Sequence, residues 1–362
     1  MLKKFISALI AVQAIITALH WLLYKLMLYF LPGLSPYKVA LAIVILLFSL
    51  GFGSFSSISH YHENRLIRFL YIFFGVWMIF AFYLFLGLAI ALPVYLIMGW
   101  PRELLGTAAL AISAGLIIYG LINARITRTI KISIKLQNLP GFWKNKTAVM
   151  ASDLHLGHVL KIGFAKKIVR LINSHRPEIV FLPGDFYDGV HTNFQELANE
   201  FKHIAAPLGS YYCSGNHEMY AGYQECETAL KNAGIKVLED ERAEVEGMQI
   251  LGLANKFETG ESVSHRLQQM DINPNKPSIL LKHIPSHLHV VEKYPVSLQL
   301  SGHTHLGQIW PFRYITKKVF KGYDYGFKQF GGLQIFTSSG AGTWGPPLRI
   351  FTKSEIVKIT FI

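Results

Sequence analysis

Eight polar residues, grouped in five short motifs, have the side chains needed to hold two metal ions and to move a proton. The motifs are Asp153-Leu-His155, Gly184-Asp185, Gly215-Asn216-His217-Glu218, His283 and Gly302-His303-Thr-His305. Carboxylate and amide oxygens combined with imidazole nitrogens, without thiolate, suit Mn, Fe, Zn or Co better than Ca or an iron–sulfur cluster. Two such ions about 3.5–4 Å apart polarise a phosphoryl group and activate the water that attacks it.

The motif residues also suggest separate roles. Asp185 is placed to bridge two ions through its carboxylate, and His217 is the natural proton donor to a leaving oxygen. Asp153 and His155 are two positions apart on an extended segment, so they reach one ion only if the backbone turns there. We expect Gly157 to permit that turn.

Each motif follows an apolar run that predicts a strand. These runs cover residues 147–151, 179–182, 210–213, 279–281 and 296–300. Amphipathic helical stretches at 164–174, 194–204 and 223–232 alternate with the first strands, a hairpin is predicted around Gly247, and a last strand is predicted at 355–361. The pattern predicts a layered α/β domain, in which strand ends converge on one crevice.

The ordered set of motifs resembles the calcineurin-like metallophosphoesterases. The resemblance covers residues 146–362 and implies a four-layer αββα sandwich. It further implies one divalent ion on Asp153, His155, Asp185 and His305, a second on Asp185, Asn216, His283 and His303, and His217 as the proton donor. The turn at residues 338–342 and the Pro-Pro-Leu-Arg run at 346–349 look like the bacterial membrane-associated branch of that family. The two ions are expected to be Mn, Fe or Zn.

The substrate class is not inherited with the metal ligands. Leu306-Gly307-Gln308 replaces the two glycines that relatives often carry before this glutamine, and no arginine follows His217 as a phosphate clamp. A phosphodiester, a phosphomonoester and a lipid-linked pyrophosphate all stay open, as do the phosphoprotein phosphatases and cyclic-nucleotide phosphodiesterases that share these metals. The alternative from another class is a membrane sensor or transport-associated module that only binds a phospho-ligand; the complete ligand set favours an enzyme.

Residues 1–124 predict a transmembrane domain of about four helices. Four apolar stretches, at 5–24, 39–55, 70–98 and 105–123, are long enough to cross a bilayer, which takes about 20 residues. The first carries Gln13 and His20, so lying along the interface is its alternative. Pro93 is the expected site of a bend in the third. Because few charges lie within these stretches, we expect an anchor rather than a transport pathway.

The distribution of charge predicts the orientation and the partners. Residues 1–140 hold 11 Lys or Arg and 2 Asp or Glu, whereas the rest holds 24 and 20. The globular part therefore has little basic excess, and no nucleic-acid partner is expected. Most basic residues near the helix ends fall on the side of both termini, which predicts a multi-pass protein of the cell membrane with its catalytic domain in the cytoplasm.

Three further segments leave alternatives open. Residues 125–145 are expected to be a juxtamembrane linker, and their alternating pattern fits either an edge strand or an amphipathic segment. Residues 310–330 interleave aromatic residues with cations, which fits either a rim of the site that meets membrane lipids or a solvated hairpin. Asp188 and Glu218 are either supports for neighbouring histidines or turn residues, and His158 is a weaker candidate for substrate contact.

Overall fold

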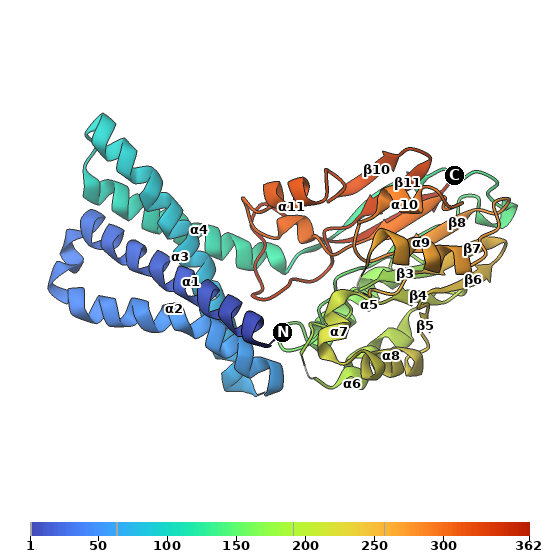
Figure 1. Ribbon diagram of the computed structural model, residues 1–362, viewed down its shortest axis with the longest axis horizontal. Coiled ribbons are helices and arrows are strands. Elements are labelled where there is room, and N and C mark those ends of the chain that lie inside the picture. The colour runs from blue at the N-terminus through green and yellow to red at the C-terminus, as the bar shows by residue number, and fades with distance from the viewer. Residues whose placement is uncertain (1, 63, 191, 257) are drawn as a thin grey trace. The chain divides into compact units, whose positions relative to one another are not determined.

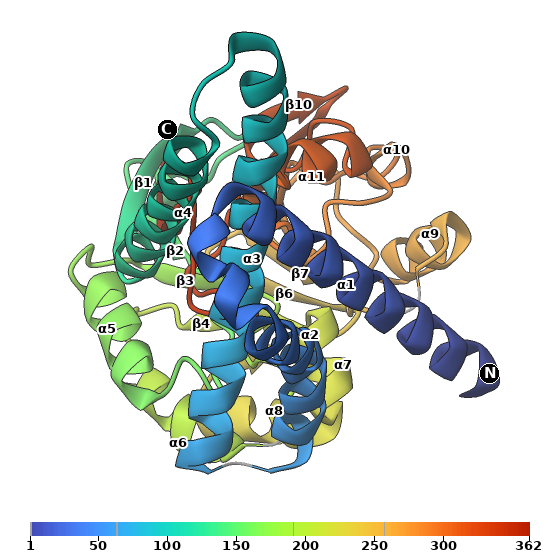
Figure 2. The same ribbon diagram turned by 90° about the vertical axis from the view of Figure 1, so that its left-hand side faces the viewer.

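The computed structural model describes residues 2–62, 64–190, 192–256 and 258–362. The chain forms two compact units. The first, here called the helical unit, extends to Ile122 and includes Gly345–Leu348; the second, here called the sandwich unit, comprises Asn123–Trp344 and Arg349–Ile362. Each is described by itself below (Figures 1 and 2).

Four long helices build the helical unit. They are α1 (Leu2–Phe30), α2 (Lys38–Tyr61), α3 (Arg65–Met98) and α4 (Arg102–Ala124), with a short 3₁₀ helix at Pro32–Tyr37. Asn64 caps α3 by accepting a hydrogen bond from the Ile67 amide at 2.8 Å, and Gly99 ends it with a positive φ of 66°. Each of the four is long and apolar enough to cross a membrane. The four predicted helices are therefore present.

Two six-stranded sheets form the centre of the sandwich unit. The first sheet has the order β1 (Thr127–Ile134), β12 (Ser354–Phe361), β2 (Thr147–Met150), β3 (Ile179–Pro183), β4 (Ser210–Cys213) and β5 (Lys236–Val237). The second has the order β10 (Gly326–Phe330), β11 (Leu333–Thr337), β9 (Leu298–Ser301), β8 (Ser278–Leu281), β7 (Met248–Gly252) and β6 (Glu241–Val245). The five motif-bearing strands are confirmed to within two residues at either end.

Alternation along the strands produces the layers. In β2 and β3, Met150 and Phe181 enter a core shared with the second sheet, whereas Val149 and Val180 face helices on the other side. The helices of this unit are α5 (Ile162–Asn173), α6 (Phe194–Asn199), α7 (Asn216–Ala221), α8 (Tyr223–Asn232), α9 (Gly260–Gln269), α10 (Leu288–Val291) and α11 (Arg313–Val319). A third core lies between the second sheet and α9 and α10. The predicted αββα sandwich is confirmed.

Two of the open segments are resolved by the sheets. Part of residues 125–145 is an edge strand, because β1 pairs in parallel with β12 over its whole length. Residues 310–330 contain the short helix α11 and then β10, which pairs in antiparallel with β11, so the segment combines a helix with the first strand of a hairpin.

Candidate metal centre

The motif residues converge at the carboxyl ends of strands from both sheets. Strands β2, β3 and β4 run parallel in one sheet, and β8 and β9 run parallel in the other, so the loops that follow them meet. Three groups of side chains have possible ligand atoms within 4.8 Å of one another. The groups are Asp153 with His155 and His305, His155 with Asp185 and His217, and Asp185 with His283 and His303.

Asp185 lies between the two ends of this cluster. One carboxylate oxygen, Oδ2, is 3.0 Å from His283 Nε2 and 3.8 Å from His155 Nε2. The other, Oδ1, accepts a hydrogen bond from the His217 backbone amide at 3.0 Å. The carboxylate thus faces imidazoles from both sheets.

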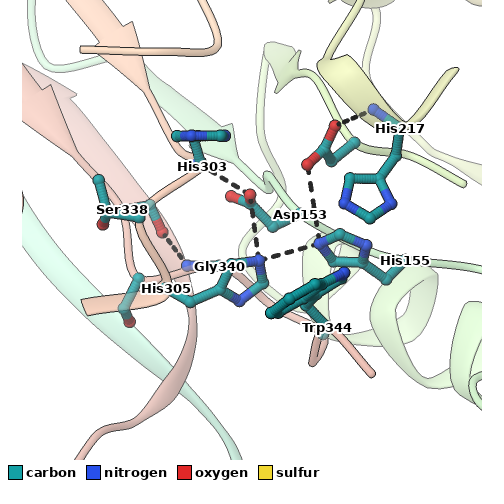
Figure 3. A network of polar contacts seen from close by, with 12 residues as sticks. Asp153, His155, His217, His303, His305, Ser338, Gly340 and Trp344 are labelled. Carbon is teal, nitrogen blue, oxygen red and sulfur yellow. Dashed lines mark hydrogen bonds and ion pairs between the residues drawn. The ribbon is translucent and has the colours of Figure 1, made fainter. Parts of the chain in front are cut away.

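Asp153 is the centre of the contacts on the other side (Figure 3). Its Oδ1 accepts a hydrogen bond from the His303 backbone amide at 2.8 Å and lies 3.5 Å from His305 Nε2. The Nε2 atoms of His155 and His305 are 2.9 Å apart. At this distance, at most one of the two facing nitrogens can carry a proton.

A left-handed backbone aims several of these side chains. The residues with positive φ are Asp153 (52°), His155 (48°), Asp185 (50°), His303 (71°) and His305 (47°). The expectation for Gly157 was therefore wrong. Gly157 has no positive φ, and Asp153 and His155 make the turn themselves. Gly157 instead leaves room for Asp188, whose Cβ would lie 3.1 Å from an added Cβ.

Neighbouring groups hold the motif residues in place. Asp188 Oδ1 lies 3.2 Å from His155 Nδ1, which fixes the ring with Nε2 toward the cluster. Glu218, fully buried, accepts backbone hydrogen bonds from Asp185, Tyr187 and Gly215 at 2.8–3.2 Å. Asp188 therefore supports a histidine, whereas Glu218 ties two motif loops together.

Arg349 supports the site, a role that the sequence alone did not predict. Its guanidinium is fully buried and donates to the backbone oxygens of Ser339 at 2.6 Å and of Gly342 at 2.7 Å, and also to His305 O at 3.3 Å. Burial lowers the pKa of Arg349 to about 10. The run 346–349 stood out in the sequence, but only the fold shows that its arginine braces the His305 loop rather than facing a substrate.

Burial and neighbouring charges shift the pKa values of the site histidines in different directions. Burial lowers the pKa of His303 to about 3 and holds that of His305 well below its usual range. Burial alone would also lower the pKa of His283, but the Asp185 carboxylate outweighs it and raises this pKa to about 9. His283 donates through Nδ1 to Pro183 O at 3.0 Å, so Nε2 is the atom turned to Asp185. The Asp185 carboxylate therefore attracts positive charge to this point.

His217 stands at the open edge of the cluster. Its half-buried ring contacts His155 at 4.6 Å between centroids, Tyr220 at 5.6 Å and Trp344 at 6.4 Å. Tyr220 and Trp344 are 62% and 60% exposed. Gln308 holds the Trp344 backbone through two hydrogen bonds of 2.8 Å. A group leaving past His217 would thus meet two aromatic side chains, which the sequence motifs did not predict.

The residues fit divalent cations. Asp153 Oδ2 and Asn216 Oδ1 are buried acceptors without a hydrogen-bond donor among the described residues. Buried polar atoms are usually paired, and a cation supplies what these oxygens lack. Gly215 and Gly302 lie so close to the Asp185 and Asp153 carboxylates that any Cβ there would overlap an oxygen. Six of the seven predicted ligand residues are brought together with His217, and the seventh, Asn216, directly precedes His217 in the chain.

Comparisons with known proteins agree with this geometry. Residues 147–307 match the calcineurin-like phosphoesterase family. The chain is 32% identical to the uncharacterized metallophosphoesterase Cj0846 of Campylobacter jejuni, over 71% of this chain and 69% of that protein. It is 31% identical to an uncharacterized metallophosphoesterase of Aquifex aeolicus, over 67% and 94%. It is 29% identical to a zebrafish protein named transmembrane protein with metallophosphoesterase domain, over 69% and 61%.

Proposed function

This chain belongs to the calcineurin-like metallophosphoesterase family, and from that premise we propose that it is a membrane-anchored, dinuclear metal-dependent phosphoesterase. The observation that carries the proposal is the position of Asp185 between His155 and His283, with further candidate ligands on both sides. One ion would be held by Asp153, His155, Asp185 and His305. The other would be held by Asp185, Asn216, His283 and His303.

The protein's own residues have distinct tasks in this reaction. Two bound divalent ions supply Lewis acidity that polarises the phosphoryl group and acidifies the attacking water. His217 lies at the exposed edge, where a leaving oxygen departs, and donates its proton to that oxygen. Asp188 keeps His155 oriented, and Asp185 fixes the His217 backbone. The substrate is a phosphate ester, either a monoester, a diester or a lipid-linked pyrophosphate.

The first test uses the full chain in detergent, supplied with Mn²⁺. Metal content is measured together with hydrolysis of bis(p-nitrophenyl) phosphate and p-nitrophenyl phosphate. Asp185→Asn is expected to lose both bound metal and activity, because one carboxylate serves both ions. His217→Ala is expected to keep its metal and to lower kcat by about 10²–10⁴-fold, the usual contribution of a proton donor.

The exposed His203→Ala serves as the matched histidine control and should leave both readouts unchanged. Full activity in His217→Ala would remove that residue from the mechanism. A wild-type chain that binds no metal would contradict the proposal as a whole, and the ratio of diester to monoester hydrolysis would narrow the substrate.

Membrane anchoring is the second part of the proposal. Its support is the set of four apolar helices and the name of the zebrafish relative. The sandwich unit is placed on the cytoplasmic side because most basic residues near the helix ends fall on that side.

A further inference from the structure

Helix α11 and its flanks form a surface that is both apolar and basic. No residue of α11 is buried. The side chains of what is here called the α11 surface are Trp310, Phe312, Tyr314, Ile315 and Val319 together with the cations Arg313, Lys317, Lys318 and Lys321. Tyr314, Ile315 and Val319 are 56–63% exposed. Such a concentration of exposed apolar side chains marks an interaction site more often than a solvated helix.

The helix has an inner and an outer side. Phe312, Ile315 and Val319 are spaced i, i+3, i+7 and share one exposed stripe. On the neighbouring face, Thr316 contacts Asp324 and Phe320 contacts the candidate ligand His303. Thr316 Oγ1 lies 3.3 Å from Asp324 Oδ2, and the Phe320 ring contacts that of His303 at 5.9 Å. Phe320 thus holds the end of α11 beside a candidate ligand, whereas Ile315 and Val319 are exposed.

The four cations of the α11 surface form no ion pair within the described part of the chain. None of the four has an acidic side chain within ion-pair distance in the described part of the chain. Arg313 lies 5.9 Å from the centroid of the Tyr314 ring, and the three lysines are exposed. Four unneutralised cations beside aromatic and aliphatic side chains match the chemistry of an anionic lipid headgroup layer. A nucleic acid would use the cations but not the apolar stripe.

The chain also brings a bilayer within reach. Only Arg125 and Ile126 separate the end of α4, a helix long enough to span a membrane, from the start of β1. So short a tether gives the sandwich unit a high effective concentration at the membrane surface. Weak contacts by a seven-residue helix are then sufficient for docking.

We propose that the α11 surface docks on the anionic surface of the bilayer that anchors this chain. Ile315 and Val319 enter the headgroup region, and Lys317, Lys318 and Lys321 contact lipid phosphates. Docking holds the His303 loop at the membrane, where a phosphate ester carried by a lipid can reach it. Docking rests on the proposed membrane anchoring, but it does not require that the site hydrolyse that ester.

The test reads the surroundings of α11 in the full chain. Both native cysteines, Cys213 and Cys226, are buried, so an engineered exposed cysteine takes a label selectively. Val319→Cys carries an environment-sensitive fluorophore, and Thr228→Cys on α8 is the control site. In nanodiscs containing phosphatidylglycerol, the Val319 label should shift to the blue relative to phosphatidylcholine discs, and the Thr228 label should not.

Charge variants make the test specific. Replacing Lys317, Lys318 and Lys321 together with Gln should abolish the blue shift, while the matched triple Lys144→Gln, Lys202→Gln and Lys293→Gln should preserve it. High salt should weaken it as well, because exposed charges are screened. A Val319 label that is equally polar in both discs would overturn the proposal. So would a shift in detergent that grows with protein concentration, since it would identify another copy of the chain as the occupant.

Discussion

Several candidate ligand residues stand on strained backbone. Asp153, His155, Asp185, His303 and His305 all have positive φ, a region that costs non-glycine residues about 1–3 kcal/mol each. Glycine would relieve the strain but supplies no ligand atom. The strain persists because hydrogen bonds from neighbouring loops hold each residue, so the residues that make those hydrogen bonds matter as much as the ligands.

Glu218 tests this dependence. Glu218→Ala removes the acceptor of three backbone N–H groups, from Asp185, Tyr187 and Gly215, and leaves them buried without a partner. We expect a loss of about 2–4 kcal/mol in the free energy of unfolding. Metal affinity should fall as well, because the Asp185 loop is released. The measurements are thermal unfolding and metal titration, with the exposed Glu225→Ala as control. Equal unfolding midpoints for the two variants would show that Glu218 supports nothing.

At the scale of elements, the loops after parallel strands carry the chemistry and neighbouring segments lock them. The loop after β4 leads into Asn216, and Ser214 within it is bound by Glu239, which follows β5. Glu239 accepts from the Ser214 amide at 2.7 Å and from its hydroxyl at 2.8 Å. The Ser214 hydroxyl in turn accepts from the Asn255 amide at 2.9 Å, which joins the loop to the segment after β7.

This link predicts a pH dependence of stability. Burial raises the pKa of Glu239 from its ordinary value of 4.5 to about 7. The folded chain therefore keeps a proton that the unfolded chain releases. The stability from this group is complete below pH 4.5 and is lost as the pH rises through 7.

Glu239→Gln removes that titration while keeping an acceptor for Ser214. As the pH rises from 5 to 8, the free energy of unfolding of the variant should increase relative to that of the parent by about 1–3 kcal/mol, since one pKa unit corresponds to about 1.4 kcal/mol. Unfolding midpoints of the full chain across that range measure the difference. The exposed Glu225→Gln should run parallel to the parent. Parallel profiles for all three proteins would refute the assignment.

At the scale of the whole molecule, most of the net positive charge lies in the first part of the chain. The first 140 residues carry a net charge of +9 and the remaining residues +4. Four cations of the first 140 residues, Arg125, Arg128, Lys131 and Lys135, belong to the sandwich unit and follow directly after α4. A basic excess beside the ends of apolar helices directs membrane topology.

The proposed orientation can be checked with intact cells. Lys202→Cys places an exposed thiol on the sandwich unit, and Trp100→Cys places one between α3 and α4. A membrane-impermeant maleimide should label position 100 from outside and position 202 only after permeabilisation, because α4 separates them. The parent chain, whose two cysteines are buried, is the control. Labelling of position 202 in intact cells would reverse the orientation.

The sequence by itself determined the classes of element and the candidate residues of the site. Apolar runs of strand length followed by Asp, Asn and His predicted a layered α/β domain, because hydrophobic periodicity and strand-end chemistry are local properties. The four apolar helices could also be predicted, because each apolar run has the length that a bilayer requires. The resemblance carried by the ordered motifs implied the αββα sandwich, the ligands of the two ions and the proton donor.

Only the tertiary structure decided how those residues are aimed and held. The left-handed turns at Asp153 and His155 are seen only in the fold. The bracing of Asp185 by Glu218 and of His305 by Arg349, and the position of Trp344 beside His217, depend on partners far along the chain. Whether residues 125–145 form a strand also depended on β12, more than 200 residues later. Local sequence cannot specify such contacts, because their energy arises when separate loops from two sheets are packed together.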